Sequence, residues 1–227
     1  MKITRLAIII MLIVVVCAWA QTKKESSEKP LVSTKEEQKQ EPEDVIFSFG
    51  PEDVDLLIDL TYSDNYKIAQ KAVYRLGQLK LKKAFDRLIS IFLFSGSSVE
   101  KGFDEVILAS IWALGELGDK RALEPLVDNY DRFKSIPYRI EIIRAIGKLG
   151  KGSEKAFIFL DRVIKSVDNN MIAFETVRAL KNVDKPEVIK TFSEVLKSGR
   201  FERWVNKEIE KALSEMGTSQ EEEKKGK

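Results

Sequence analysis

Apolar residues recur along this chain at intervals that place them on one face of successive α-helices. One reference residue marks the common register in each of five segments: Leu76, Leu114, Ile146, Leu180 and Leu213. Four positions before them stand Ala72, Ser110, Ile142, Thr176 and Ile209, and eight positions before them stand Ile68, Val106, Tyr138, Ile172 and Val205. Residues spaced by four lie along one stripe of an α-helix. The pattern therefore predicts five amphipathic helices that share one register.

The same segments repeat a short phrase. Residues 113–119 read Ala-Leu-Gly-Glu-Leu-Gly-Asp, and residues 145–151 read Ala-Ile-Gly-Lys-Leu-Gly-Lys. The position just before the reference residue is alanine in four of the five segments, and such a small side chain lets a neighbouring helix approach closely. Self-similarity with a period of about 30 to 40 residues indicates stacked helical repeats.

A partner helix accompanies each of these five helices. The first partner is expected near residues 51–60, and apolar residues four positions apart mark the others: Ala84 and Leu88, Ala122 and Leu126, Ala156 and Leu160, and Val188 and Phe192. We assign Phe92 and Phe94 to the helix core. No long stretch alternates with period two, so no sheet is expected. The predicted fold class is all-α, an α-solenoid (superhelix) of about five stacked antiparallel helix pairs.

The connections between helices carry residues that end and begin them. Gly118 and Gly150 suit the left-handed conformation that closes a helix. Asp119 and Ser153 are expected to cap the helix that follows each of them. Asp184, which precedes a Lys-Pro pair, is expected to cap the next helix with proline in its first turn.

Residues 1–20 have the features of a secretory signal peptide. Basic residues precede an apolar run from Leu6 to Val16, and Ala18-Trp19-Ala20 fits a small-x-small site with cleavage between Ala20 and Gln21. The run is shorter than the ~20 apolar residues that span a bilayer. The alternatives are an uncleaved anchor and lipidation of Cys17, although a lipoprotein signal has a small residue where Val16 stands. Each interpretation places the body outside the cytoplasm, in the periplasm or another extracytoplasmic compartment. Only an uncleaved anchor or a lipidated Cys17 would keep it in contact with a membrane, through the leader.

Composition divides the remainder into three parts. Residues 21–44 are polar and mixed in charge, and such a segment buries too little apolar surface to offset its ordering entropy, so we expect a disordered linker. Residues 45–217 carry the repeats and form the predicted domain. Residues 218–227 are rich in Glu and Lys and are expected to form a disordered charged tail.

Composition also excludes several classes of function. The chain has no histidine, the side chain that most often acts as a general acid, a general base or a zinc ligand near neutral pH. Its single cysteine, Cys17, lies in the leader, so the mature chain would have no thiol nucleophile. Without Lys2 and Arg5 the chain has 36 basic and 36 acidic residues, unlike a nucleic-acid binder. We therefore expect no catalytic residues, no cofactor, no metal site and no nucleic-acid partner.

The paired helices and the Ala-Leu-Gly-Glu-Leu-Gly-Asp phrase resemble HEAT repeats, in particular the short variety shared with phycobilisome lyases. The resemblance covers roughly residues 50–217 and is strongest at the second and third copies. It implies a curved superhelix whose second helices line the concave side. The family often carries Val-Arg early in the second helix, and this chain has that pair only partly, as Tyr138-Arg139. We therefore expect contacts between repeats to depend on apolar packing, and the resemblance carries over no lyase residues.

A column of candidate partner-binding residues lies two positions before the reference residues. Its members are Tyr74, Trp112, Arg144, Arg178 and Lys211. Aromatic residues and arginine are enriched at binding hot spots. The simpler interpretation of the basic members is a solvated face with local ion pairs, because Glu141, Glu175 and Glu208 stand three positions before them. Trp112 is either a binding residue or packed against the connection at residues 95–102, and Trp204 is expected in the core or on the closing surface of the last repeat.

These observations lead to one main hypothesis and two alternatives. The main hypothesis is an exported, monomeric, non-enzymatic scaffold or adaptor that binds another protein of the cell envelope on its concave face. The first alternative is a subunit or chaperone-like partner of an enzyme of the lyase type. The second is a structural component of the envelope that assembles with itself.

Overall fold

The computed structural model describes residues 42–94 and 102–225. The expected signal peptide, the expected cleavage site at Ala20–Gln21, Cys17 and residues 21–41 of the expected linker lie outside the described residues. Ile46–Lys227 forms one compact unit. None of the helices in the described ranges is long and apolar enough to cross a membrane.

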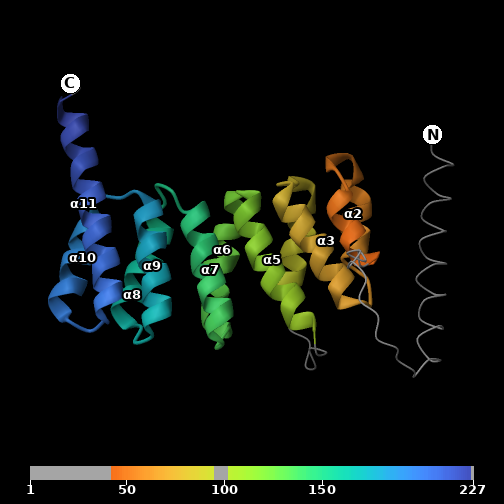
Figure 1. Cartoon of the computed structure of the whole chain (residues 1–227), viewed down its shortest axis with the longest axis horizontal. Coiled ribbons are helices and arrows are strands. Elements are labelled where there is room, and N and C mark those ends of the chain that lie inside the picture. The colour runs from red at the N-terminus through yellow and green to blue at the C-terminus, as the bar shows by residue number, and fades with distance from the viewer. Residues whose placement is uncertain (1–41, 95–101, 226–227) are drawn as a thin grey trace, which may run out of the picture. The chain divides into compact units, whose positions relative to one another are not determined.

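Ten α-helices, arranged as five pairs, make up the described part of the compact unit (Figure 1). The pairs are α2 (Val54–Leu60) with α3 (Tyr66–Gln78), α4 (Phe85–Leu93) with α5 (Phe103–Leu117), α6 (Leu123–Asn129) with α7 (Ile136–Leu149), α8 (Glu154–Ser166) with α9 (Asn170–Val183), and α10 (Glu187–Ser198) with α11 (Arg203–Lys225). The short 3-10 helices are η1 (Pro42–Ser48), η2 (Pro51–Asp53), η3 (Lys82–Ala84), η4 (Lys120–Ala122) and η5 (Tyr130–Arg132). No residue within 42–94 or 102–225 is in a strand, which confirms the all-α solenoid.

The helices form two layers. In the second-helix layer, α3, α5, α7, α9 and α11 pack in that order, each against the next, and the first helices cover this layer. The predicted apolar stripe faces the core between the layers. The reference residues Leu76, Leu114, Ile146 and Leu180 are fully buried, and so are Ala72, Ser110, Ile142 and Thr176 four positions earlier. Leu213, Ile68 and Tyr138 are partly buried at the ends and edge of the array.

Glycine and alanine interlock where neighbouring second helices cross. A methyl group added to Gly147 would lie 2.8 Å from both Cα and Cβ of Ala179 on the next helix. The same clash would occur between Gly77 and Ala113 and, at 3.0 Å from Cα, between Gly115 and Ala145. The glycine of the repeated phrase is therefore required by the close approach of two helix backbones, and the alanine expected to be small is its partner.

Polar contacts also join consecutive repeats, in addition to the apolar packing expected from the sequence. Arg132 donates hydrogen bonds to the carbonyl oxygens of Phe92 (2.6 Å) and Leu93 at the end of α4. Arg200 donates in the same way to Ile164 (2.9 Å) and Lys165 at the end of α8. The last carbonyl groups of a helix have no intrahelical partner, so each arginine satisfies the end of a helix in the preceding repeat.

Two of the predicted turn residues adopt another conformation. Gly118 is left-handed as expected, with φ +68°, and Asp119 caps η4 through the N–H of Arg121. Gly150 instead has φ −86°, and its added Cβ would meet Ala156 at 2.5 Å, so close packing accounts for this glycine. Asp184 ends α9 in the left-handed region, with φ 58°, and does not cap α10, whose N-cap residue is Pro186.

Two further expectations require correction. Phe92 is fully buried, but Phe94 follows the end of α4 and is 46% exposed, so it is not a core residue. At the other end of the domain, α11 continues to Lys225, past the boundary expected at residue 217. Glu and Lys have high helix propensity, which favours this continuation.

Candidate functional site

The five column residues lie on the five helices of the second-helix layer. Tyr74, Trp112, Arg144, Arg178 and Lys211 belong to α3, α5, α7, α9 and α11 in turn. Because each of these helices packs against the next, the column crosses the layer from the first repeat to the last. The structure divides it into an aromatic part over α3 and α5 and a basic part over α7, α9 and α11.

The aromatic part is a contact between Tyr74 and Trp112. Their ring centroids are 5.1 Å apart in an edge-to-face arrangement, and both side chains are partly buried. The Trp112 ring lies over Gly77, where a Cβ atom would approach it to 2.8 Å. Trp112 therefore packs against α3. Most of the connection at residues 95–102 lies outside the described residues. Burial raises the pKa of the Tyr74 phenol.

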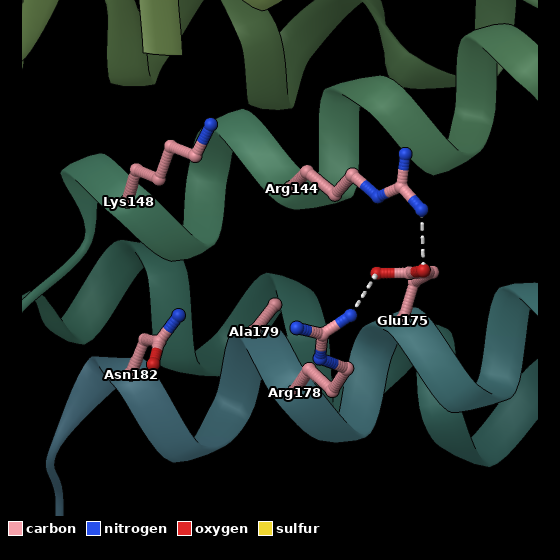
Figure 2. A pocket seen from close by; sticks show the side chains of 6 residues that line it. All are labelled: Arg144, Lys148, Glu175, Arg178, Ala179 and Asn182. Atoms are coloured by element: carbon pink, nitrogen blue, oxygen red, sulfur yellow. Dashed lines mark hydrogen bonds and ion pairs between the residues drawn. The ribbon is translucent and has the colours of Figure 1, made fainter. Parts of the chain in front are cut away.

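The basic part is organised by a buried carboxylate. Glu175 on α9 has a side chain that is only 5% exposed, and it accepts a hydrogen bond of 2.5 Å from Arg144 Nη2 on α7 (Figure 2). Its second oxygen lies 3.9 Å from Arg178 Nη1 on its own helix. Arg144 and Arg178 keep 44% and 57% of their side chains exposed. Glu175 therefore holds two guanidinium groups from adjacent repeats beside each other while leaving both open to solvent.

A surface pocket of about 250 Å³ lies between α7 and α9 at this place. It is lined by Arg144, Lys148, Glu175, Arg178, Ala179 and Asn182 (Figure 2). Lys148 also forms an ion pair of 2.5 Å with Glu116 on α5, so charged contacts continue from α5 to α9. The lining offers several N–H donors and one amide group, which suits the recognition of polar or acidic groups on a partner surface.

The local ion pairs of the simpler interpretation form in two of three places. Arg144 Nη1 lies 3.4 Å from Glu141, and Arg178 lies 3.9 Å from Glu175. Lys211 is exposed on α11 and has no ion pair with Glu208 within the described residues. Trp204 is 39% exposed and contacts Phe174 at 5.3 Å, so it lies on the surface of the last repeat.

Glu141, which pairs with Arg144, is a carboxyl group of this site whose pKa is changed by burial. Its side chain is 12% exposed, and burial raises its pKa although Arg144 opposes the shift. A carboxyl group with a raised pKa in the folded state binds more protons there than in the unfolded state, so stability falls as pH rises through that pKa.

Replacing Glu141 with glutamine is therefore expected to preserve or slightly raise stability at neutral pH. The variant should also lose part of the decline in stability that the parent chain shows above the ordinary glutamate pKa. Urea unfolding at several pH values measures both effects. A large loss of stability at neutral pH would show that the bond to Arg144 outweighs the cost of burying the carboxylate.

Sequence reasoning identified the column but missed how its basic members are connected. The separation of 31 residues between Arg144 and Glu175 spans one repeat and places them on adjacent helices. The recurrence of Glu at 141, 175 and 208 was the available signal, and it was interpreted only within single helices. Lys148 and Asn182 were not identified as site residues. Among the residues in the described ranges, no group of three or more Asp, Glu, His or Cys side chains is placed to hold a metal ion.

Comparisons with known proteins agree with this architecture. Residues 106–132 match the family described as PBS lyase HEAT-like repeat, which confirms the resemblance drawn from the repeated phrase. The matched segment runs from α5 through η5 and includes Trp112 and the Gly-Asp turn. No curated protein matches the chain.

A solved structure with a similar fold is the complex of CpcE and CpcF of phycocyanin lyase from Nostoc sp. PCC7120. The chain is 16% identical to it, with a TM-score of 0.59, and the match covers 83% of this chain and 70% of that chain. This likeness shows the fold that the two proteins share.

Proposed function

We propose that this chain is a non-catalytic binding subunit that holds a partner protein against its second-helix layer, as a component or assistant of an enzyme. The observation that carries the proposal is the Arg144–Glu175–Arg178 arrangement. A buried carboxylate that fixes two exposed guanidinium groups from separate repeats pre-organises them, which lowers the entropy lost on binding. The neighbouring Tyr74–Trp112 pair adds the aromatic side chains that commonly anchor protein interfaces.

The comparisons support the enzyme-associated form of this proposal. The similar solved structure is a complex of two lyase subunits, so its fold is used there in an assembly between protein chains. The chain's own composition favours a binding role over catalysis, because it has no histidine and its one cysteine lies in the leader. We propose that the partner protein supplies the chemistry of the assembly.

We further propose that this assembly lies outside the cytoplasm and that the chain is a monomer before it binds. The support for export is the basic start, the apolar run from Leu6 to Val16 and the Ala18-Trp19-Ala20 site in the sequence. Fractionation of cells into cytoplasm, periplasm and membrane, with detection of the chain in each, tests the location.

Site-specific photo-crosslinking tests the binding role. A photoreactive amino acid at Asn182, which is exposed beside the pocket, is expected to capture one partner protein. The same amino acid at Ile158, exposed on α8 in the other layer, serves as the matched control and should not capture that partner. Adding Arg178→Ala should lower the yield from position 182 about thirtyfold, since truncating a hot-spot arginine costs about 2 kcal/mol.

The outcomes separate the proposal from its rivals. Equal capture from both positions, or capture that Arg178→Ala leaves unchanged, would show that the column does not bind the partner. A captured partner that is a second copy of the chain would favour self-assembly over an enzyme-associated role.

A further inference from the structure

Two polar side chains of the pocket between α7 and α9 donate no hydrogen bond to any residue that the structure describes. Arg178 lies 3.9 Å from Glu175, which is beyond hydrogen-bonding distance, and its guanidinium group has no other carboxylate partner in the described ranges. Asn182, one helical turn further along α9, has a side-chain amide with two N–H donors. Both side chains are exposed. Exposed donors of this kind bind water, which a ligand group can replace.

The polar side chains of the pocket form two facing rows. Arg144 and Lys148 are four residues apart on α7, so they lie along one face of that helix. Arg178 and Asn182 have the same spacing on α9. Figure 2 shows the last two side chains on either side of Ala179, which is buried and forms an apolar floor between them. A polar group that enters between the rows meets N–H donors from both helices.

The exposed charge of the pocket is positive. The carboxylates that offset the two arginines, Glu175 and Glu141, are almost buried. Arg144, Lys148 and Arg178 each keep 40% or more of the side chain exposed. A partner that contacts this surface therefore meets cationic groups, although the chain as a whole is close to neutral.

A second pocket of about 380 Å³ continues the first toward the ends of α7 and α9. The two pockets share Lys148 and Asn182. The second adds Lys151, which follows α7, and Lys181, which lies near the end of α9, together with Asp184. We call the two pockets together the basic groove. It offers cationic groups at successive points between the two helices.

The lysines of the basic groove form ion pairs that a ligand can replace. These pairs are Lys148–Glu116, Lys151–Asp184 and Lys181–Glu215. In each pair both side chains are at least a quarter exposed. Ion pairs between exposed side chains contribute little to stability, so an incoming carboxylate can take the place of the resident one at small cost.

We propose that the basic groove binds an acidic segment of the partner protein, with one carboxylate of that segment bound by Arg178 and Asn182. The proposal rests on the function proposed above and names the chemistry of the partner at the same site. A guanidinium group presents parallel N–H donors that match both oxygens of a carboxylate. Further acidic side chains of the segment would contact Lys148, Lys151 and Lys181 along the groove.

The surroundings of the groove favour a carboxylate over a phosphate group. Glu175 and Glu141 already offset part of the positive charge, so a singly charged carboxylate matches the site better than a doubly charged phosphate does. The groove also lies along the second halves of α7 and α9. Phosphate groups bind most readily at the opposite end of a helix, where backbone N–H groups are free to donate.

Binding of a short acidic peptide to the full-length chain tests the proposal. The probe is a fluorescein-labelled peptide in which glutamate alternates with glycine, and fluorescence anisotropy measures its affinity. A peptide with glutamine in place of every glutamate is the control. At low salt the glutamate peptide should bind at least about tenfold more tightly than the glutamine peptide, and high salt should reduce the difference.

Substitutions locate the binding to the groove. Arg178→Ala should weaken binding of the glutamate peptide at least about tenfold, the loss expected for one charge-assisted hydrogen bond. Asn182→Asp should have at least as large an effect, because it places a carboxylate in the site. Arg162→Ala is the matched control, since Arg162 on α8 is as exposed as Arg178 and lies 3.7 Å from Asp131. It should leave the affinity unchanged. Circular dichroism shows whether each variant is helical.

Three results with the peptides would overturn the proposal. Equal affinity for the glutamate and glutamine peptides would show that the groove does not recognise carboxylates. An affinity that Arg178→Ala leaves unchanged would place the binding elsewhere on the chain. Tighter binding of a peptide with phosphoserine in place of glutamate would assign the groove to a phosphorylated partner.

Photo-crosslinking from position 211 separates this proposal from the proposed function. Lys211 is exposed on α11 in the same layer and lines neither pocket of the groove. A partner captured from position 211 with a yield that Asn182→Asp lowers would support both proposals. A yield that Asn182→Asp leaves unchanged would overturn the acidic segment and keep the binding role. Peptide binding without capture of any partner would keep the chemistry of the groove and overturn the proposed function.

Discussion

Replacing Ile142 with aspartate is expected to unfold the repeat domain. Ile142 lies in the middle of α7, has no solvent-exposed surface and belongs to the apolar stripe. The substitution removes a buried apolar side chain and introduces a carboxylate with no buried partner, which together cost about 5 kcal/mol or more. That loss is comparable to the whole stability of a typical domain. Because α7 belongs to the central repeat, its unfolding leaves each flanking pair with a neighbour on one side only.

Ile158→Asp is the matched control for this prediction. It makes the same chemical change on α8, where the isoleucine is 59% exposed, and should alter stability by no more than about 0.5 kcal/mol. Thermal unfolding followed by circular dichroism distinguishes the two variants. An unchanged melting curve for Ile142→Asp would show that the register of the apolar stripe differs from the one described.

Replacing Gly147 with alanine is expected to destabilise the domain by about 2 kcal/mol, although alanine is the better helix former. The propensity gain of about 1 kcal/mol applies only where the added methyl group has room. At Gly147 that group would lie 2.8 Å from the backbone and the side chain of Ala179, and neither atom belongs to a flexible chain end. The two helices would have to separate, which opens the interface between α7 and α9.

Gly217→Ala is the matched control for Gly147→Ala, and it is expected to change stability in the opposite direction. Gly217 lies in helix α11 and has no atom within 4 Å of an added Cβ. Its replacement should therefore stabilise the chain slightly, by up to about 1 kcal/mol. Denaturant titration of both variants tests the sign of each change. A stabilised Gly147→Ala variant would show that α7 and α9 are farther apart than in this structure.

Much of the fold was predictable because the buried residues of an amphipathic helix recur at regular intervals along the sequence. The positions of Leu114, Ser110 and Val106 follow from the intervals of four residues, and all three are fully buried. The wrong predictions concern residues at the ends of helices, where the main chain changes conformation. Phe94 belongs to an apolar run but follows the last turn of α4, and periodicity does not reveal where a helix stops. Asp184 is suitable for either end of a helix, and its position in the turn decided which one it closes.

The sequence predicted which positions belong to the candidate site, but it did not predict the contacts between their side chains. Arg144 and Arg178 share a helical position, so the sequence places them in one column. That Glu175 is buried and accepts from Arg144 on the adjacent helix depends on how far α7 and α9 are rotated and shifted against each other. The same holds for Trp112, whose ring is covered by α3 through the absence of a side chain at Gly77.

The sequence by itself determined the all-α class, the five helix pairs and the side of each helix that faces the core, because these depend on spacing along one chain. Tertiary structure alone decided which residues meet between repeats. The interlock of Gly147 with Ala179 and the contact of Arg132 with the end of α4 both join segments about one repeat apart. Such contacts are fixed by the distance and rotation between packed helices, which the packing of both layers sets together.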